Sequence, residues 1–301
     1  MTESEITQFF TAALYKAPKR YGAGDDCALV EAGVIVTQDT MVEGIHFDDR
    51  LSAADVGWKL VAVNASDIGA MGRMPSWATL SISLPKDIKP EWLEGFREGL
   101  LEACRTWSIK LCGGDTTASP GPIMLSMTMG SPRGSTPIWR SGAKPGDSIW
   151  VTGTIGEAAA GFFEKNNPPG LDALRRPHPP VVFGAKMGAA EVPTAMIDLS
   201  DGLHKDLTRL CQASGVGAIV YPDKLPMGPA CSIVRDPIPY QTAFGEDYQL
   251  LFTALPSMAQ VIKRYAREAN VTFEEIGKIR EKPEIELKGR PWPEPLCAHF
   301  T

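Results

Sequence analysis

Apolar residues along this chain follow two periods, one typical of helices and one typical of strands. Val56, Leu60 and Val63 recur at helical spacing and predict an amphipathic helix over residues 55–71. The segment WATLSISL, residues 77–84, alternates apolar and polar side chains and predicts a half-buried strand. The two periods together predict a mixed α+β fold, with sheets against which helices pack.

The same two periods predict the other elements of the chain. We expect an opening helix that includes Ile6 and Phe9 and ends near Pro18, and a mobile loop over the proline-rich residues 166–182. Further helices are expected over 90–107, 157–165, 201–214 and 257–268. Further strands are expected on both sides of Gly33 and over 109–115, 123–130, 148–153, 193–200, 217–221, 248–254 and 273–279.

A stretch rich in Gly, Pro and Ser separates two periodic regions. It covers residues 131–147, SPRGSTPIWRSGAKPGD, and is typical of a linker or a crossing loop. A length of 301 residues suits about two domains. We therefore predict an N-terminal α/β domain over 1–138 and a C-terminal α+β domain over 139–301.

Composition and charge narrow the classes of protein. Hydrophobic residues make up 44% and charged residues 22%, which is ordinary for a globular chain with a sizeable core. The net charge of −6 offers no general attraction for nucleic acid or for an anionic membrane. Six cysteines form no CxxC pair, and the acidic N-terminus MTESEITQFF does not resemble a signal peptide. We expect buried, reduced thiols, a cytoplasmic protein, and no nucleic-acid or membrane partner.

Aspartates recur where a strand ends or a glycine turn begins, and one more lies on a polar helix face. Mg²⁺ prefers oxygen ligands, especially carboxylates that it shares with substrate phosphates. Two bare carboxylates 4 Å apart repel by about 4 kcal/mol at an effective dielectric constant near 20, so a cluster needs a cation. Each aspartate taken singly could equally be a turn former or a helix cap. The set that predicts a magnesium-nucleotide site is Asp25, Asp26, Asp39, Asp67, Asp115, Asp198 and Asp201.

Familiar nucleotide-binding motifs do not fit the chain. GAGDDC has Cys27 in place of the third glycine of a dinucleotide fingerprint, and no GxxxxGK[ST], HRD or DFG occurs. Phosphates must be held by other groups. Candidates are a nest of backbone amides in GGDTT, residues 113–117, and the side chains of Arg140, Lys144 and Ser200.

Eight motifs lie along nearly the whole chain: GAGDDCALV, TQDTMVEGIHF, AVNASDIGAMG, LCGGDTT, RSGAKPGD, VTGTIGEAAAG, IDLSDGL and GEDYQLLF. Their order and spacing resemble those of thiamine-monophosphate kinases. That family lies within the superfamily of aminoimidazole ribonucleotide synthetase and selenophosphate synthetase. The resemblance implies ATP-dependent phosphorylation of thiamine monophosphate with several Mg²⁺ ions. It also implies a homodimer paired through N-terminal domains.

The resemblance assigns roles to particular residues. His46 and Glu246 would meet thiamine monophosphate, with Asp247 as a weaker candidate, and Gly114, Asp115, Arg140 and Ser200 would contact ATP. Because the acceptor is an anionic phosphate oxygen, no covalent or general-base catalytic residue is expected. The magnesium ligands would be Asp26, Thr37, Asp39, Asp67, Asp115, Asp198 and Asp201.

Two departures from the family pattern concern the metal site and ring recognition. Gln38 stands where the family has Thr or Ser, so a metal contact there must use the backbone carbonyl or be lost. Cys297 stands where the family presents an aromatic ring to thiamine, and Trp292 or Phe300 would have to substitute.

Two other kinds of function stay open at this point. One is a superfamily relative that acts on a purine precursor or makes selenophosphate. A selenophosphate synthetase would need a reactive cysteine in a glycine-rich N-terminal loop, and none precedes Cys27. The other is a module that binds nucleotide or metal without turnover.

Overall fold

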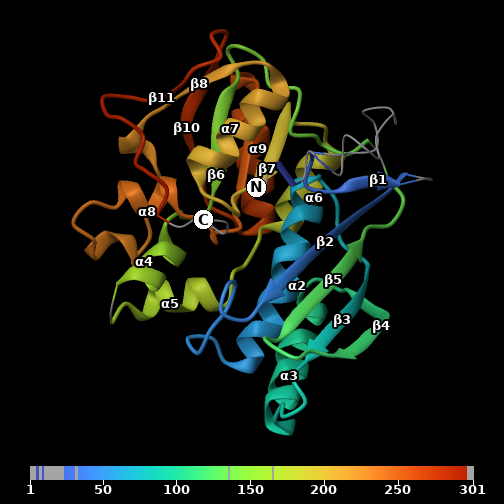
Figure 1. The fold of residues 1–301 in the computed structure, drawn as a ribbon. Coiled ribbons are helices and arrows are strands. Elements are labelled where there is room, and N and C mark those ends of the chain that lie inside the picture. The colour runs from blue at the N-terminus through green and yellow to red at the C-terminus, as the bar shows by residue number, and fades with distance from the viewer. Residues whose placement is uncertain are drawn as a thin grey trace.

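The chain forms two mixed β-sheets, each built from its own part of the sequence and each with its own helices (Figure 1). The computed structural model describes residues 5, 6, 9, 24–30, 33–134, 136–164 and 166–296. The predicted opening helix therefore lies largely outside the described residues, as do Cys297 and Phe300. The fold is α+β, as the two periods of the sequence predict.

The first sheet has one covered face and one open face. Its strands are β1 (Ala28–Val30), β2 (Val34–Val42), β3 (Trp77–Leu84), β4 (Lys110–Ala118) and β5 (Met124–Gly130), in the order β1-β2-β5-β3-β4. Helices α2 (Ala53–Ala70) and α3 (Pro90–Thr106) belong to the same hydrophobic core as its strands. Only β3 and β4 pair in parallel, and α3 connects them. One covered face explains why burial alternates along β2 and β5.

The second sheet is covered on both faces. Its order is β11 (Ile285–Leu287), β8 (Gly217–Val220), β10 (Phe273–Arg280), β6 (Ser148–Thr152), β9 (Leu250–Ala254) and β7 (Ala195–Asp198). Helix α7 (Leu203–Ser214) packs into one hydrophobic cluster, while α6 (Val181–Ala189) and α9 (Ala259–Ala269) pack into another. All residues of the three strands β6, β7 and β9 are buried, which two covered faces require.

The predicted loop over 166–182 is wrong, because most of this segment is helical. Helix α5 (Pro168–Arg175) begins at a proline, and the side chain of Asn167 accepts a hydrogen bond from the amide of Gly170 at 3.2 Å. Proline suits the first turn of a helix, where its missing N–H has no partner to lose. Helix α6 then begins at Val181. The two remaining short helices of the C-terminal part are α4 (Glu157–Phe163) and α8 (Ile238–Ala243).

The two sheets divide the chain near the predicted linker. The first uses residues up to 130 and the second begins at 148, so we propose a domain boundary near residue 138. Trp58 joins the two parts by donating its indole N–H to the carbonyl of Pro177 at 2.9 Å. Arg176 forms an ion pair with Asp55 at 2.7 Å across the same junction.

Burial and helix length bear on two further features of the chain. All cysteines in the described residues are free, but Cys112 is exposed rather than buried because it lies on the edge strand β4. Within the described part of the chain, no helix has both the length and the apolar character that crossing a bilayer requires.

Candidate active site

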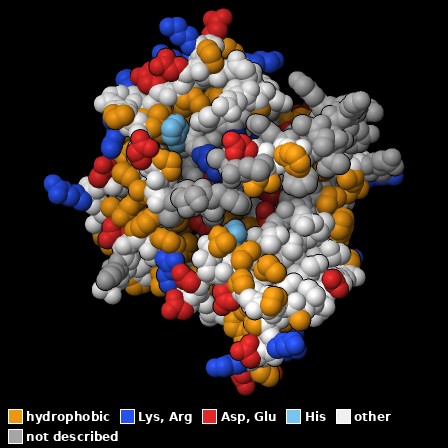
Figure 2. All heavy atoms as spheres, viewed as in Figure 1, with side chains coloured by type: hydrophobic (Ala, Val, Ile, Leu, Met, Phe, Trp, Pro, Cys, Tyr) orange, Lys and Arg blue, Asp and Glu red, His pale blue; other side chains and the backbone are white. Residues whose placement is uncertain are grey.

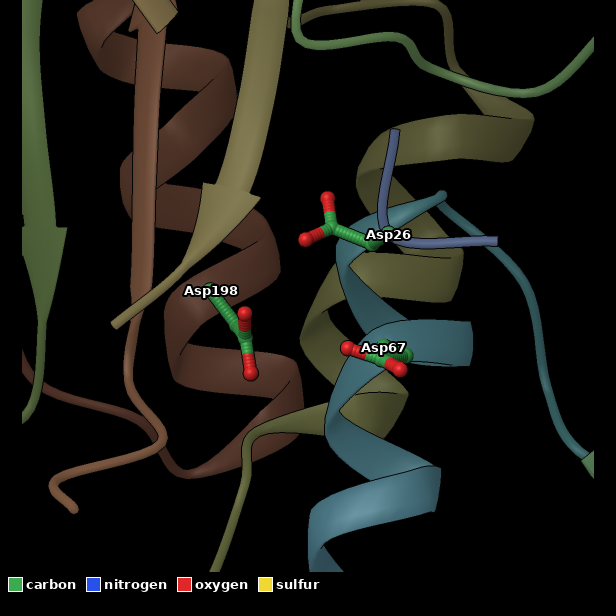
Figure 3. Close-up of side chains that lie close together, drawn as sticks. All are labelled: Asp26, Asp67 and Asp198. Atoms are coloured by element: carbon green, nitrogen blue, oxygen red, sulfur yellow. The ribbon is translucent and has the colours of Figure 1, made fainter. Parts of the chain in front are cut away.

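Three aspartates from distant parts of the chain converge where the two sheets meet (Figure 3). Asp26 precedes β1, Asp67 lies in the last turn of α2, and Asp198 ends β7. One carboxylate oxygen of each lies within 4.8 Å of those of the other two. Helical spacing in the sequence predicts Asp67 on a polar face of α2, and in the structure that face meets the other two carboxylates.

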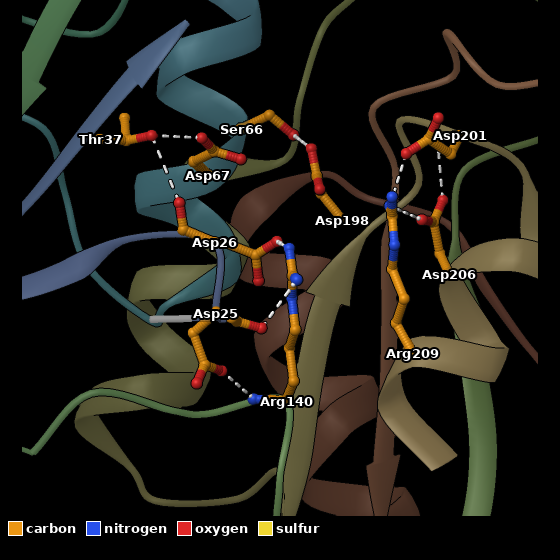
Figure 4. A network of polar contacts seen from close by, with 11 residues as sticks. Asp25, Asp26, Thr37, Ser66, Asp67, Arg140, Asp198, Asp201, Asp206 and Arg209 are labelled. Atoms are coloured by element: carbon orange, nitrogen blue, oxygen red, sulfur yellow. Dashed lines mark hydrogen bonds and ion pairs between the residues drawn. The ribbon is translucent and has the colours of Figure 1, made fainter. Parts of the chain in front are cut away.

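Neighbouring side chains hold these carboxylates in place (Figure 4). The hydroxyl of Thr37 donates to Oδ2 of Asp67 at 2.5 Å, and the hydroxyl of Ser66 donates to Oδ2 of Asp198 at 2.6 Å. Thr37 and Ser66 come from β2 and α2 of the N-terminal part, while Asp198 ends β7 of the second sheet, so both parts of the chain contribute to these contacts.

Burial and the neighbouring carboxylates raise the pKa values of several aspartates in and beside the cluster. Burial, followed by the charges of Asp39, Asp198 and Asp26, raises the pKa of Asp67 well above its usual range. Burial, followed by the charge of Asp26, likewise raises the pKa of Asp198. Burial and the charge of Asp26 raise the pKa of Asp39 to about 6. These groups repel one another, and a divalent cation would relieve that repulsion.

Asp26 is shared between this cluster and Arg140. The Arg140 guanidinium donates to Oδ1 of Asp26 at 2.6 Å, while the Arg140 backbone N–H donates to Asp25 at 2.6 Å. The other oxygen of Asp26, Oδ2, is buried without a hydrogen-bond partner. A buried oxygen without a partner, beside two further carboxylates, is a donor set that suits Mg²⁺.

The raised pKa values predict how stability changes with pH. The folded state binds these protons more tightly than the unfolded chain does, because the pKa values are raised on folding. The stability that this binding contributes is present below pH 3.8, the ordinary pKa of aspartate. It is lost as the pH rises to about 6 for Asp39, and over a wider range for Asp67, whose pKa is raised well above 3.8. We expect Mg²⁺ to raise the melting temperature more at pH 8 than at pH 5. Differential scanning fluorimetry with and without Mg²⁺ measures this, and an equal shift at both values would contradict it.

Asp201 does not join the cluster. Its carboxylate accepts hydrogen bonds from Lys205 at 2.8 Å and from Arg209 at 2.5 Å, and these cations lower its pKa despite partial burial. Arg209 also bonds to Asp206 at 2.9 Å, which leaves these groups in a second network beside the first (Figure 4).

Asp115 lies on the open side of the first sheet. It pairs with Ser81, Ser81 with Ser126, and Ser126 with Thr40, so these side chains share one face. Thr37 and Asp39 occupy the alternate positions of β2 and point toward α2. Within one chain Asp115 is therefore separated from the cluster by the sheet.

The predicted nest of amides in GGDTT is wrong, because residues 113–117 are extended within β4. Gly114 is explained by packing, since a Cβ there would lie 1.7 Å from the carbonyl oxygen of Leu80. The side chain of Gln38 is also on the open face, where it accepts a hydrogen bond from Thr128 at 3.0 Å.

A cavity of about 900 Å³ lies between the two parts of the chain. His46 and Phe47 from the segment after β2 line one side, and Phe244 to Glu246 from the segment after α8 line the other. Ser200 also lines it, two residues after Asp198, which brings the cavity to the metal-site candidates. Figure 2 shows hydrophobic side chains gathered over α4 and α8, close to this region.

The polar candidates around the cavity differ in how they are held. The ring Nδ1 of His46 accepts a hydrogen bond from the amide of Val42 at 3.1 Å, so its proton is on Nε2. Asp247 accepts hydrogen bonds from Gly156 at 2.7 Å and from Ala158, at the start of α4. Burial raises the pKa of Asp247 to about 8, and these bonds indicate a structural role. Lys144 is exposed in the loop before β6.

Sequence reasoning missed several residues of this region. Lys59 interrupts the apolar stripe of α2, which is the signal that could have found it. Phe162 and Phe244 line the cavity with ring centroids 5.3 Å apart, and nothing in their spacing marks them. Trp292 stacks on His204 at 4.3 Å, so its ring already has a partner.

Comparisons with known proteins agree with this architecture. Residues 24–131 match the family described as AIR synthase related protein, N-terminal domain, and residues 144–290 match its C-terminal domain. The thiamine-monophosphate kinase of Salmonella typhimurium is 40% identical over 253 residues, which cover 77% of this chain and 75% of that protein.

Two solved structures extend the likeness to nearly the whole chain. A structure of AaThiL complexed with AMPPCP and TMP has a TM-score of 0.85 and 30% identity, covering 97% of this chain and 96% of its own. The thiamine-monophosphate kinase of Stenotrophomonas maltophilia has a TM-score of 0.80 and 34% identity, with coverage of 95% and 96%.

Proposed function

The chain belongs to the thiamine-monophosphate kinase family, and we propose that it transfers the γ-phosphoryl group of ATP to the phosphate of thiamine monophosphate. The products are ADP and thiamine diphosphate. The observation that carries this proposal is the three-carboxylate cluster beside a cavity of about 900 Å³. Such a site can accept two phosphate groups at one end and an organic ring system at the other.

We propose that Asp26, Asp67 and Asp198 hold Mg²⁺, with Asp39 close by. The buried, unpartnered Oδ2 of Asp26 and the raised pKa values of its neighbours support this assignment. Bound Mg²⁺ supplies positive charge that offsets the repulsion between two phosphate groups. Thr37 then acts by orienting Asp67 through its hydroxyl.

We propose that the remaining candidate residues bind and orient ATP and thiamine monophosphate. Arg140 lies against Asp26 with its guanidinium beside the cluster, which is the position from which it can contact an ATP phosphate. Ser200 lines the cavity two residues after Asp198, and its carbonyl accepts a hydrogen bond from the amide of Glu246, so it neighbours both groups. His46 and Glu246 line the same cavity, which supports their assignment to thiamine monophosphate. Because a phosphate oxygen is already anionic, the transfer needs position and charge neutralisation rather than a general base.

We further propose a homodimer in which Asp115 serves the site of the partner. Every residue of β4 is exposed, and Asp115 lies on the sheet face opposite the one that α2 covers. A second copy placed on that face would cover β4 and could bring Asp115 to a cluster that it does not reach in its own chain.

Cytoplasmic location stays a prediction from the sequence.

Turnover by the purified protein tests the proposed function. We expect Mg-ATP and thiamine monophosphate to yield ADP and thiamine diphosphate in equal amounts, measured by chromatography of both products. ADP formed only with a purine precursor or with selenide would favour a superfamily relative. Binding of ATP without any ADP would favour a binding module.

A further inference from the structure

Lys59 is a buried lysine whose side chain lies in the wall of the cavity. It belongs to α2, between the apolar positions Val56 and Leu60, and only 2% of its side chain is exposed. Lysine is almost never buried to this extent unless it is paired. Its partner is Glu246, and the ammonium group and carboxylate form an ion pair between the two domains.

Glu246 reaches this pair from a backbone conformation that non-glycine residues rarely adopt. Its φ is 73°, and Tyr248 in the same segment between α8 and β9 has a φ of 49°. The other described non-glycine residues with positive φ closely follow helix ends, where this conformation is common. Strained backbone persists only where the surroundings enforce it, and it occurs most often at functional sites.

The surroundings of Glu246 do enforce its position. Its amide donates to the carbonyl of Ser200 at 3.0 Å, and the amide of Tyr248 donates to that of Leu199 at 2.9 Å. A Cβ at Gly245 would lie 1.8 Å from the carbonyl oxygen of Ser200, so this segment is pressed against the chain that follows β7. Glu246 is thus fixed by its backbone on one side and by Lys59 on the other.

We propose that Lys59 is a positioning residue for substrate recognition, which acts by holding the Glu246 carboxylate toward the cavity. The inference rests on the proposed function and assigns Glu246 the aminopyrimidine end of thiamine monophosphate. Oxygen Oε2 of Glu246 is buried at Lys59, while 17% of its side chain stays exposed and lines the cavity. A carboxylate in this position accepts hydrogen bonds from an amino group of the ligand.

The position of Lys59 on α2 agrees with the shape of such a substrate. Asp67 lies eight residues further along the same helix, a rise of about 12 Å at 1.5 Å per residue. The helix therefore separates the metal-site candidates in its last turn from the Lys59 pair by about 12 Å along its axis. Thiamine monophosphate carries its phosphate at one end and its pyrimidine ring at the other. Phe162 and Phe244 add aromatic surface to the same cavity.

Steady-state kinetics of Lys59→Met test this inference. We expect KM for thiamine monophosphate to rise about 10- to 100-fold, the range for a hydrogen bond to a charged group, while kcat stays within threefold and KM for ATP is unchanged. Lys59→Arg keeps the positive charge and should hold KM within about fivefold of wild type. Glu246→Gln should reproduce the loss, and the double variant should add little to either single one.

Lys186→Met is the matched control, because Lys186 forms an exposed pair with Glu268 at 2.7 Å. It should leave both KM values unchanged. An unchanged KM for thiamine monophosphate in Lys59→Met would overturn the inference. So would a parallel loss of affinity for a non-hydrolysable ATP analogue together with a lower melting temperature, since that indicates a structural role. If Lys59→Met does not fold, an unchanged KM in Glu246→Gln overturns it. Failure of the proposed function is distinct, because the wild-type protein would then make no thiamine diphosphate.

Discussion

Asp67→Asn is expected to abolish phosphoryl transfer and yet to stabilise the metal-free protein at pH 8. The carboxylate oxygens of Asp26, Asp67 and Asp198 lie within 4.8 Å of one another. At that distance two full charges repel by about 3 kcal/mol at an effective dielectric constant of 20. Asparagine removes one of these charges, while its amide oxygen still accepts the hydrogen bond that Thr37 donates. Folding therefore loses a repulsion and keeps a contact.

We expect Asp67→Asn to remove more transition-state stabilisation than it adds to the free energy of unfolding. A cation that neutralises transferring phosphate contributes several kcal/mol to the transition state, and each 1.36 kcal/mol is tenfold in rate. We expect kcat/KM to fall by about 10³-fold or more, measured by ADP release with thiamine monophosphate present. The melting temperature without metal should rise by a few degrees, and the rise caused by Mg²⁺ should disappear.

Asp223→Asn is the matched control, since Asp223 is exposed on the short helix Pro222–Lys224. It makes the same chemical change outside the cluster and should alter neither quantity. Activity near the wild-type value in Asp67→Asn would remove Asp67 from the metal site. A lower melting temperature in the absence of Mg²⁺ would show that the cluster carries less repulsion than its raised pKa values imply.

Local patterns in the sequence predict most elements because burial and period coincide there. The strand over 77–84 and the helix ending at Ala70 follow directly from spacing. The helix α5 was missed because its prolines were read as breakers, although a proline at the first helical position favours a start. Helix α8 and strand β11 span 6 and 3 residues, too few for a period to appear.

The sequence predicts residues of the candidate site only where a local sequence signal marks them. Asp26, Asp67 and Asp198 each follow a local signal, and their convergence supports the interpretation of these three aspartates as one site. Asp201 carried the same signal, but its neighbours Lys205 and Arg209 lie one and two turns along α7 and pair with it. The Lys59–Glu246 pair joins residues 187 positions apart, and no local pattern specifies which distant carboxylate a buried lysine will meet.

A mixture of two inactive variants is expected to recover about a quarter of wild-type activity if Asp115 serves the partner's site. Asp115→Asn and Asp67→Asn should each be inactive alone. In a mixed dimer one site would carry both substitutions and the other would carry neither. Random pairing makes half of the dimers mixed, and one of their two sites is intact. Co-expression with two affinity tags, followed by the ADP-release assay, measures the recovery.

The pairing of Asp67→Asn with Asp198→Asn separates this outcome from simple dilution. Both residues lie in the cluster of their own chain, so each site of that mixed dimer keeps one defect and activity should stay at background. If Asp115 served its own chain, the first mixture would behave in the same way and show no recovery. The open sheet face and the exposed strand β4 argue against an Asp115 that serves its own chain. The register from Asp115 through Ser81 and Ser126 to Thr40 puts its side chain on the sheet face that points away from α2. A side chain held on that face can meet an aspartate cluster only if another copy supplies it.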